Sequence, residues 1–191
     1  MEIIFWISLI IIVYTFLGYG FILYLMLRIR RIIFGKPPQV FYDPDQVTTC
    51  TLLIAAYNEE SFIIEKIKNT LALEYPGGKL EIIFITDGST DRTPDILREY
   101  PEIKLLHQND RKGKVAAMHR AQAFVNTEII IFTDANTLLN KEALIKISRH
   151  YADETVGAVA GEKRVHFDEK ADAGAAGEGF YWKYESLLKK W

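Results

Sequence analysis

The sequence predicts an α/β fold with a doubly wound, mostly parallel sheet, and three observations support this prediction. A ten-residue phrase occurs twice, as EIIFITDGST at Glu81–Thr90 and as EIIIFTDANT at Glu128–Thr137. Each copy is an apolar, β-branched run that ends at Thr-Asp, which is typical of a buried parallel strand. A helical pattern follows each copy, and strands that alternate with helices indicate right-handed βαβ crossovers.

The expected elements follow one another from residue 50 onward. A first strand is predicted at Cys50–Ala55, and apolar residues at helical spacing predict a helix after it: Ile63, Ile67 and Leu71. The next elements are, in chain order, the strand of the first phrase, a short helix that Thr93 caps and that ends near Tyr100, a strand at Ile103–His107, a helix at Lys114–Val125 and the strand of the second phrase.

The last part of the chain is predicted to begin with a helix that Asn140 caps. A fifth strand is expected at Val156–Val165. The stretch Asp168–Gly179 is rich in Ala and Gly and is predicted to be flexible, and Phe180–Trp191 places its aromatic and Leu residues on one face of an amphipathic helix.

Composition and charge narrow the class of protein. The 191 residues are 49% hydrophobic and carry a formal net charge of −2, so one domain with a real core is expected and nucleic acid is not an expected partner. The single cysteine, Cys50, lies in an apolar strand, so it is predicted to be a buried structural thiol.

The N-terminus is predicted to anchor the chain in the inner or plasma membrane. No charged side chain occurs from Ile3 to Leu27, and roughly twenty-five such residues suffice for one membrane-spanning helix. Basic residues follow this stretch at Arg28, Arg30 and Arg31. The positive-inside rule then predicts a single pass with the rest of the chain in the cytosol.

The two repeated strands also predict a binding site. Because the carboxyl ends of parallel strands share one edge of a sheet, Asp87 and Asp134 are expected to lie at the same edge, where such folds bind ligands. Two carboxylates there suit a phosphorylated, polyoxygenated ligand and its divalent cation. A dehydrogenase glycine fingerprint is missing after the first strand, where the chain reads Ala55–Glu60, and Arg111–Lys114 lacks the hydroxyl residue and upstream glycine of a phosphate loop.

The motifs together resemble family-2 glycosyltransferases, in particular the membrane-bound, cellulose-synthase-like branch. The resemblance covers nearly all of residues 50 to 191 and rests on Ala55–Glu59, Thr86–Asp91, Lys112–Lys114 with Ala116 and Ala117, Thr133–Asn136, Gly157–Gly161 and Glu178–Glu185. It implies a GT-A fold, a nucleotide-sugar donor that is usually UDP-linked, Mn²⁺ or Mg²⁺ as cofactor, a glycan or lipid acceptor, and inversion at the anomeric carbon.

The resemblance also assigns roles to individual residues. Nucleotide-binding positions would be Ala55, Tyr57 and Glu59 beside the nucleoside, Asp87 on the base or ribose, and Lys114 on the diphosphate. Asp134 would be the first acid of the metal-binding Asp-x-Asp motif. Its second position is Asn136, which removes one negative charge, so the sequence predicts either weaker metal binding or a site in which Asn136 is not a ligand.

Four regions are predicted. Composition predicts a transmembrane anchor at 1–33 and a linker at 34–49, and the resemblance predicts a GT-A nucleotide-sugar-binding domain at 50–167 and, at 168–191, the start of the acceptor half. The general base of an inverting transfer is expected beyond Trp191, in a longer chain or a second polypeptide. Two hypotheses follow: the donor half of a glycosyltransferase at the cytosolic membrane face, or a non-catalytic remnant that binds nucleotides or docks a partner.

Overall fold

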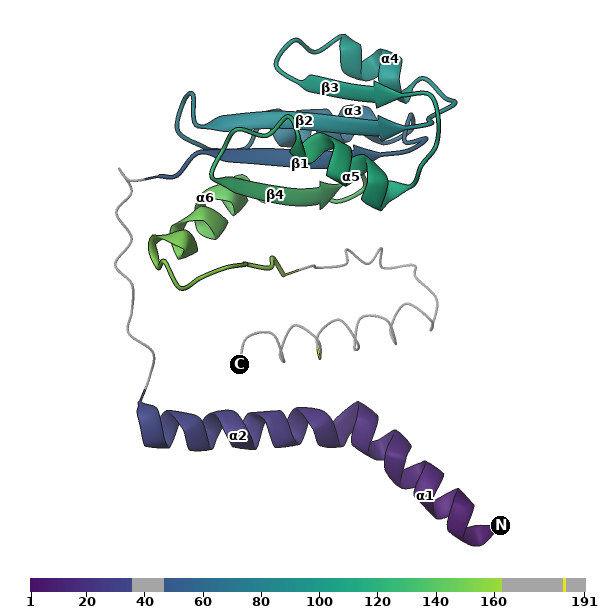
Figure 1. The fold of residues 1–191 in the computed structure, drawn as a ribbon, viewed down its shortest axis with the longest axis vertical. Helices are drawn as coiled ribbons and strands as arrows, with labels where there is room; N and C mark the ends of the chain where they lie inside the picture. The colour runs from purple at the N-terminus through teal and green to yellow at the C-terminus, as the bar shows by residue number, and fades with distance from the viewer. Residues whose placement is uncertain (36–46, 163–183, 185–191) are drawn as a thin grey trace. The chain divides into compact units, whose positions relative to one another are not determined.

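The computed structural model describes residues 1–35, 47–162 and 184. The chain divides into two compact units, of which one contains the N-terminal helices and the other contains a β-sheet (Figure 1).

The N-terminal unit contains an almost continuous apolar helix. Helices α1 (Glu2–Val13) and α2 (Tyr19–Phe34) are joined by a π-helical turn, η1 (Tyr14–Gly18). Helix geometry often changes direction at such a turn, and the ribbon bends there (Figure 1). Together they form a 33-residue helix that is long and apolar enough to cross a membrane.

The second unit is built on a four-stranded sheet in which every neighbouring pair is parallel. The strands are β1 (Cys50–Ala56), β2 (Leu80–Asp87), β3 (Lys104–Gln108) and β4 (Ile129–Asp134), in the spatial order β3-β2-β1-β4 (Figure 1). Both repeated phrases therefore form strands, as predicted, and they lie on either side of β1. Ala55 pairs with Asp134 in the register with β4 and with Ile85 in the register with β2.

Helices cover both faces of the sheet, as a doubly wound fold requires. Three helices pack on one face, around Leu52, Ile54 and Phe84: α3 (Ile63–Leu71), α4 (Thr93–Arg98) and α6 (Ala143–Ser148), which η2 (Arg149–Ala152) extends. Helix α5 (Lys114–Gln122) packs on the other face through Ala117 and Ala121. The alternation of strands and helices thus produces the predicted layers.

Three predicted elements differ in the structure. Residues 156–162 belong to no strand, since the two glycines at 157 and 161 leave few side chains to stabilise one. Thr93 is the first residue of α4 rather than its cap, because its hydroxyl accepts the backbone N–H of Glu59. Helix α6 begins at Ala143, and Asn140 accepts the Ala143 N–H through its carbonyl oxygen rather than its side chain.

Two further predictions concern Cys50 and residues 168–191. Cys50 is buried, as expected, and burial raises the pKa of its thiol although a contact with Tyr75 lowers it. The flexible stretch at 168–179 and the helix at 180–191 lie outside the described residues, apart from Tyr184, which is helical.

Candidate functional site

The seven residues singled out from the sequence meet at one cavity. It has a volume of about 270 Å³ and lies at the carboxyl ends of β1, β2 and β4. Its walls include all seven: Ala55, Tyr57, Glu59, Asp87, Lys114, Asp134 and Asn136. The seven residues converge because the carboxyl ends of parallel strands lie at one edge of the sheet, and the chain turns away from the sheet after each strand.

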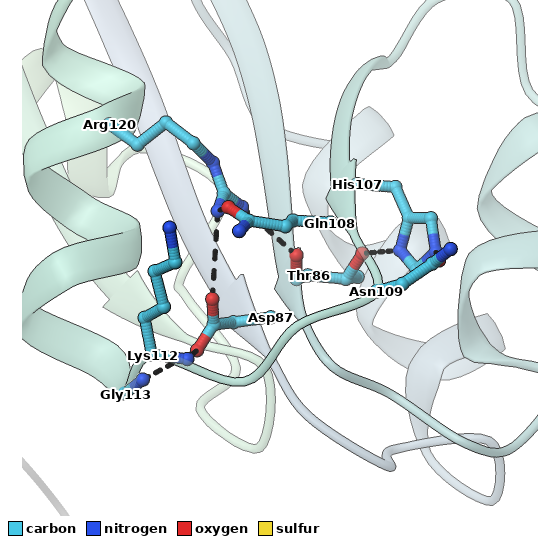
Figure 2. A network of polar contacts seen from close by, with 8 residues as sticks. All are labelled: Thr86, Asp87, His107, Gln108, Asn109, Lys112, Gly113 and Arg120. Atoms are coloured by element: carbon cyan, nitrogen blue, oxygen red, sulfur yellow. Dashed lines mark hydrogen bonds and ion pairs between the residues drawn. The ribbon is translucent and has the colours of Figure 1, made fainter.

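Asp87 is built into the protein at one end of this cavity. Its side chain is only 8% exposed, and its Oδ2 accepts backbone N–H groups from Lys112 at 2.8 Å and Gly113 at 2.6 Å. Its Oδ1 is covered, accepts no hydrogen bond and lies 3.6 Å from Nη1 of Arg120 (Figure 2). Asp87 therefore fixes the segment 111–114, which carries several of the basic residues of the site.

Arg120 joins α5 to the ends of two strands. Besides facing Asp87, it donates from Nη2 to the carbonyl oxygen of Thr86 at 3.2 Å and from Nη1 to Oε1 of Gln108 (Figure 2). On the other side of β2, the hydroxyl of Thr86 lies 2.7 Å from Nδ1 of His107. The end of β2 is thus held by Arg120 of α5 and by His107 of β3.

The wall next to Asp87 contains a cation–π contact. The guanidinium carbon of Arg111 lies 3.9 Å from the centre of the Tyr57 ring, and Nη1 donates to the Tyr57 hydroxyl at 3.2 Å. Both residues line the cavity. A planar guanidinium and an aromatic ring provide a flat surface beside the Asp87 end.

The loop after β1 is fastened to the loop after β2. Oδ2 of Asp91 accepts the backbone N–H of Glu60 at 3.0 Å, and Oε2 of Glu60 accepts the backbone N–H of Arg92 at 3.1 Å. Burial would raise the pKa of Asp91, but the hydrogen bonds from Thr93 and Glu60 hold it below its ordinary value. These two hydrogen bonds between the loops fix the backbone around Glu59. The Glu60 side chain therefore has a structural role.

Asp134 and its neighbours form a more open end of the cavity. Its side chain is 52% exposed and forms an ion pair with Lys114, which is 55% exposed. Asn136 is exposed two residues further on. Ala135 between them is buried and donates its N–H to the Ala55 carbonyl at 3.2 Å, so the backbone is fixed while the side chains on either side face the cavity.

The donor set at this end fits a magnesium or manganese ion. Asp134 supplies a carboxylate and Asn136 an amide oxygen, and hard divalent cations prefer oxygen ligands. Among the described residues, no group of three or more His, Cys, Asp or Glu side chains could hold a metal alone. The two oxygen donors therefore suit an ion whose remaining ligands come from a phosphorylated substrate and water.

A buried lysine lies beneath the Asp134 end. Lys66 of α3 is completely buried, and its ammonium lies 3.5 Å from the hydroxyl of Thr133 and donates to the carbonyl oxygen of Thr137. Burial lowers the pKa of Lys66 to about 8, although the negative charge of Asp134 acts in the opposite direction. The ammonium is thus a buried cation close to the residues that would hold a metal.

The sequence interpretation missed Lys66 and Arg120, yet both carry a common signal. Each follows a buried residue by three positions on its helix, Ile63 in one case and Ala117 in the other. That spacing places a charged residue on the buried face of a helix, where it needs a polar partner. The partners themselves lie far away in sequence, so the pattern alone could not name them.

Comparisons with known proteins agree on one family. The family model described as glycosyl transferase family 2 matches residues 51–190. The chain is 36% identical over 121 residues to a beta-monoglucosyldiacylglycerol synthase from Nostoc sp.. This match covers 60% of the present chain and 26% of that relative. It is 30% identical over 152 residues to a poly-beta-1,6-N-acetyl-D-glucosamine synthase from Staphylococcus aureus, covering 76% of this chain and 35% of the relative.

A solved structure shows the same fold. A mannosyltransferase from Pyrobaculum calidifontis, in complex with GDP-Man and Mn²⁺, matches with a TM-score of 0.69 and 32% sequence identity. The match covers 81% of this chain and 46% of that protein. The chain thus spans less than half of each of these three proteins.

Proposed function

Because the chain belongs to glycosyl transferase family 2, we propose that it forms the donor-binding part of a membrane-anchored, inverting glycosyltransferase. The family match and the GT-A-like fold agree with the resemblance that the sequence motifs predict. The observation that carries the proposal is the convergence of all seven predicted residues on one cavity. The donor would be a nucleotide sugar, UDP-linked in our proposal, and the acceptor a glycan or lipid.

The two ends of the cavity suit the two parts of such a donor. The nucleoside would lie among Ala55, Tyr57, Glu59 and Asp87, with Asp87 on the base or ribose. The diphosphate would lie at the other end. There Lys114 would exchange its ion pair with Asp134 for contacts with phosphate oxygens.

A divalent cation would complete the diphosphate end. We propose that Asp134 binds it directly and that Asn136 contributes a neutral oxygen, with Mn²⁺ or Mg²⁺ as the ion. When bound, the cation would neutralise the charge that develops on the departing diphosphate. Two oxygen donors and one negative charge predict weak binding of the metal alone and much stronger binding in the presence of the nucleotide. The relative solved with GDP-Man and Mn²⁺ supports a divalent ion.

The N-terminal helix supports a membrane location. The apolar helix Glu2–Phe34 carries Arg28, Arg30 and Arg31 near its end, and we propose that this end faces the cytosol together with the sheet unit. Transfer would then occur at the cytosolic face of the membrane, where nucleotide sugars would reach the cavity. Donor binding is the role assigned to the described residues; the acceptor and the general base are assigned to none of them.

Calorimetry on the full chain in detergent tests this proposal. UDP and GDP are titrated with Mn²⁺, with Mg²⁺ and with a chelator, using the wild type, Asp134→Ala, Asn136→Asp and the exposed control Asp95→Ala. We expect metal-dependent binding of one nucleotide that Asp134→Ala abolishes and that Asn136→Asp makes more metal-dependent by restoring a charge. The control should behave as the wild type. Equal nucleotide affinity with and without metal, unaffected by Asp134→Ala, would refute the assignment.

A further inference from the structure

Two side chains of α3 hold the loop that follows Asp134. Lys66 donates to the carbonyl oxygen of Thr137, and Asn69 bonds Leu139 twice. The amide nitrogen of Asn69 donates to the Leu139 carbonyl at 2.8 Å, while its oxygen accepts the Leu139 N–H at 2.9 Å. Residues three apart lie on the same side of a helix, so one face of α3 fastens this loop at two points.

The burial of Lys66 needs an explanation beyond packing. Moving an ammonium out of water is costly, and an apolar side chain of similar length would fill the same space without that cost. None of the ion pairs among the described residues includes Lys66. The lowered pKa, with burial as the main cause, records that cost. What the ammonium gains is a hydrogen bond to the loop that carries Asn136 and a position close to Asp134.

The loop also needs external support, because few of its own contacts fix it. Ala135 donates to Ala55, and the Thr137 N–H donates to the carbonyl oxygen of Asp134 at 3.2 Å. Asp134 and Asn136 themselves are exposed. Metal and phosphate binding requires ligand atoms held within roughly 0.5 Å of the productive geometry, which exposed side chains achieve only when their backbone is fixed.

We propose that Lys66 and Asn69 are positioning residues that hold the loop 134–139 in the shape required for binding the metal and the diphosphate. They touch neither ligand and act through the backbone at Thr137 and Leu139. This proposal rests on the proposed function, since it concerns the diphosphate end of the donor cavity. It separates that end from the nucleoside end, since the hydrogen bonds that α3 side chains form within the described part of the chain go to Thr133, Thr137 and Leu139.

The experiment compares a whole nucleotide with its nucleoside. Lys66→Met and Asn69→Ala each remove one tie, and Lys68→Met is the matched control, because Lys68 is an exposed lysine of the same helix. For each full-length variant in detergent, affinity is measured for UDP or GDP, whichever binds the wild type, with saturating Mn²⁺ by calorimetry. Affinity for the corresponding nucleoside is measured by NMR titration. The melting temperature is recorded in parallel.

We expect both variants to lose about tenfold in nucleotide affinity, the effect of one lost hydrogen bond to a charged or closely fitted group, with nucleoside affinity within about twofold of the wild type. Lys68→Met should leave both affinities unchanged. Equal losses for nucleotide and nucleoside would show a general structural role and overturn the proposal. Tighter nucleotide binding in Lys66→Met with no change in Asn69→Ala would also overturn it, by showing that Lys66 acts only through its charge.

Two features keep these outcomes interpretable. Asn69→Ala removes a tie without touching a buried charge, so it tests the proposal even when Lys66→Met does not fold. A wild type that binds neither UDP nor GDP with metal would refute the proposed function, whereas a wild type that binds and variants that bind equally well would refute only the positioning role.

Discussion

The two copies of the repeated phrase end in the same Thr-Asp pair but in opposite environments. The Asp87 side chain is 8% exposed and bonded to backbone amides, whereas the Asp134 side chain is 52% exposed and paired with the exposed Lys114. Both strands are parallel neighbours of β1 and end at the same edge. The difference shows that a motif can specify where a carboxylate lies while the surrounding segments decide whether it is buried or exposed.

The residue after each aspartate explains much of this difference. Gly88 has φ +71°, donates its N–H to the Gln108 carbonyl at 2.8 Å and lies close against Arg111, so the segment after β3 folds over Asp87. Ala135 occupies the corresponding place in the second copy and donates to Ala55 on the neighbouring strand instead. The end of β2 at Asp87, which we call the first rim, is therefore enclosed. The end of β4 at Asp134, the second rim, is open.

The threonine that precedes each aspartate also has a different partner in the two copies. Thr86 lies against His107, which also bonds Asn109 at 2.8 Å, so its partner comes from the adjacent strand β3. Thr133 lies near Lys66, whose ammonium comes from α3 beneath the sheet. The first threonine is thus contacted from an adjacent strand, whereas the second lies near the buried ammonium of Lys66.

The largest expected effect breaks the enclosed rim. Asp87→Ala leaves two backbone N–H groups without their acceptor and Arg120 without its carboxylate, so we expect a loss of about 3 to 5 kcal/mol in the free energy of unfolding. Urea unfolding followed by circular dichroism measures it, with Asp95→Ala as the exposed control. A loss under about 1 kcal/mol would show that Asp87 does not hold the segment 111–114.

The contrast between the rims also marks the limit of sequence interpretation. The period of the apolar residues predicted the four strands of the sheet and the helices between them, and the rule for parallel strands brought Asp87 and Asp134 to one edge, because both depend on local pattern. The enclosure of Asp87 depends on residues 108–113, and the clasp between Glu60 and Asp91 joins two loops. Such contacts form only once the sheet has assembled, so no local sequence pattern predicts them.

A smaller effect comes from making the first copy resemble the second. Gly88→Ala adds a Cβ that would lie 2.7 Å from Cβ and 2.9 Å from the backbone nitrogen of Arg111, at a φ that disfavours alanine. Strain and displacement together should cost about 2 to 4 kcal/mol of stability, measured by urea unfolding. Gly113→Ala is the matched control: its φ is +93°, but its Cβ would meet nothing within 4 Å. Equal losses in the two variants would argue against the close approach of Arg111.

The smallest expected effect on stability comes from removing the open carboxylate. Asp134→Ala deletes an exposed ion pair with Lys114, and such pairs contribute little because water screens them. The charge of Asp134 also favours the charged form of buried Lys66, which adds to the loss. Both contributions together should stay below about 1 kcal/mol in urea unfolding at neutral pH. Asp134→Asn, which keeps an oxygen, separates the charge from the side-chain volume. A loss comparable to that of Asp87→Ala would mean that Asp134 holds the structure as Asp87 does. The burial of Asp87 and the exposure of Asp134 would then not predict how much each carboxylate contributes to the stability of the unliganded fold.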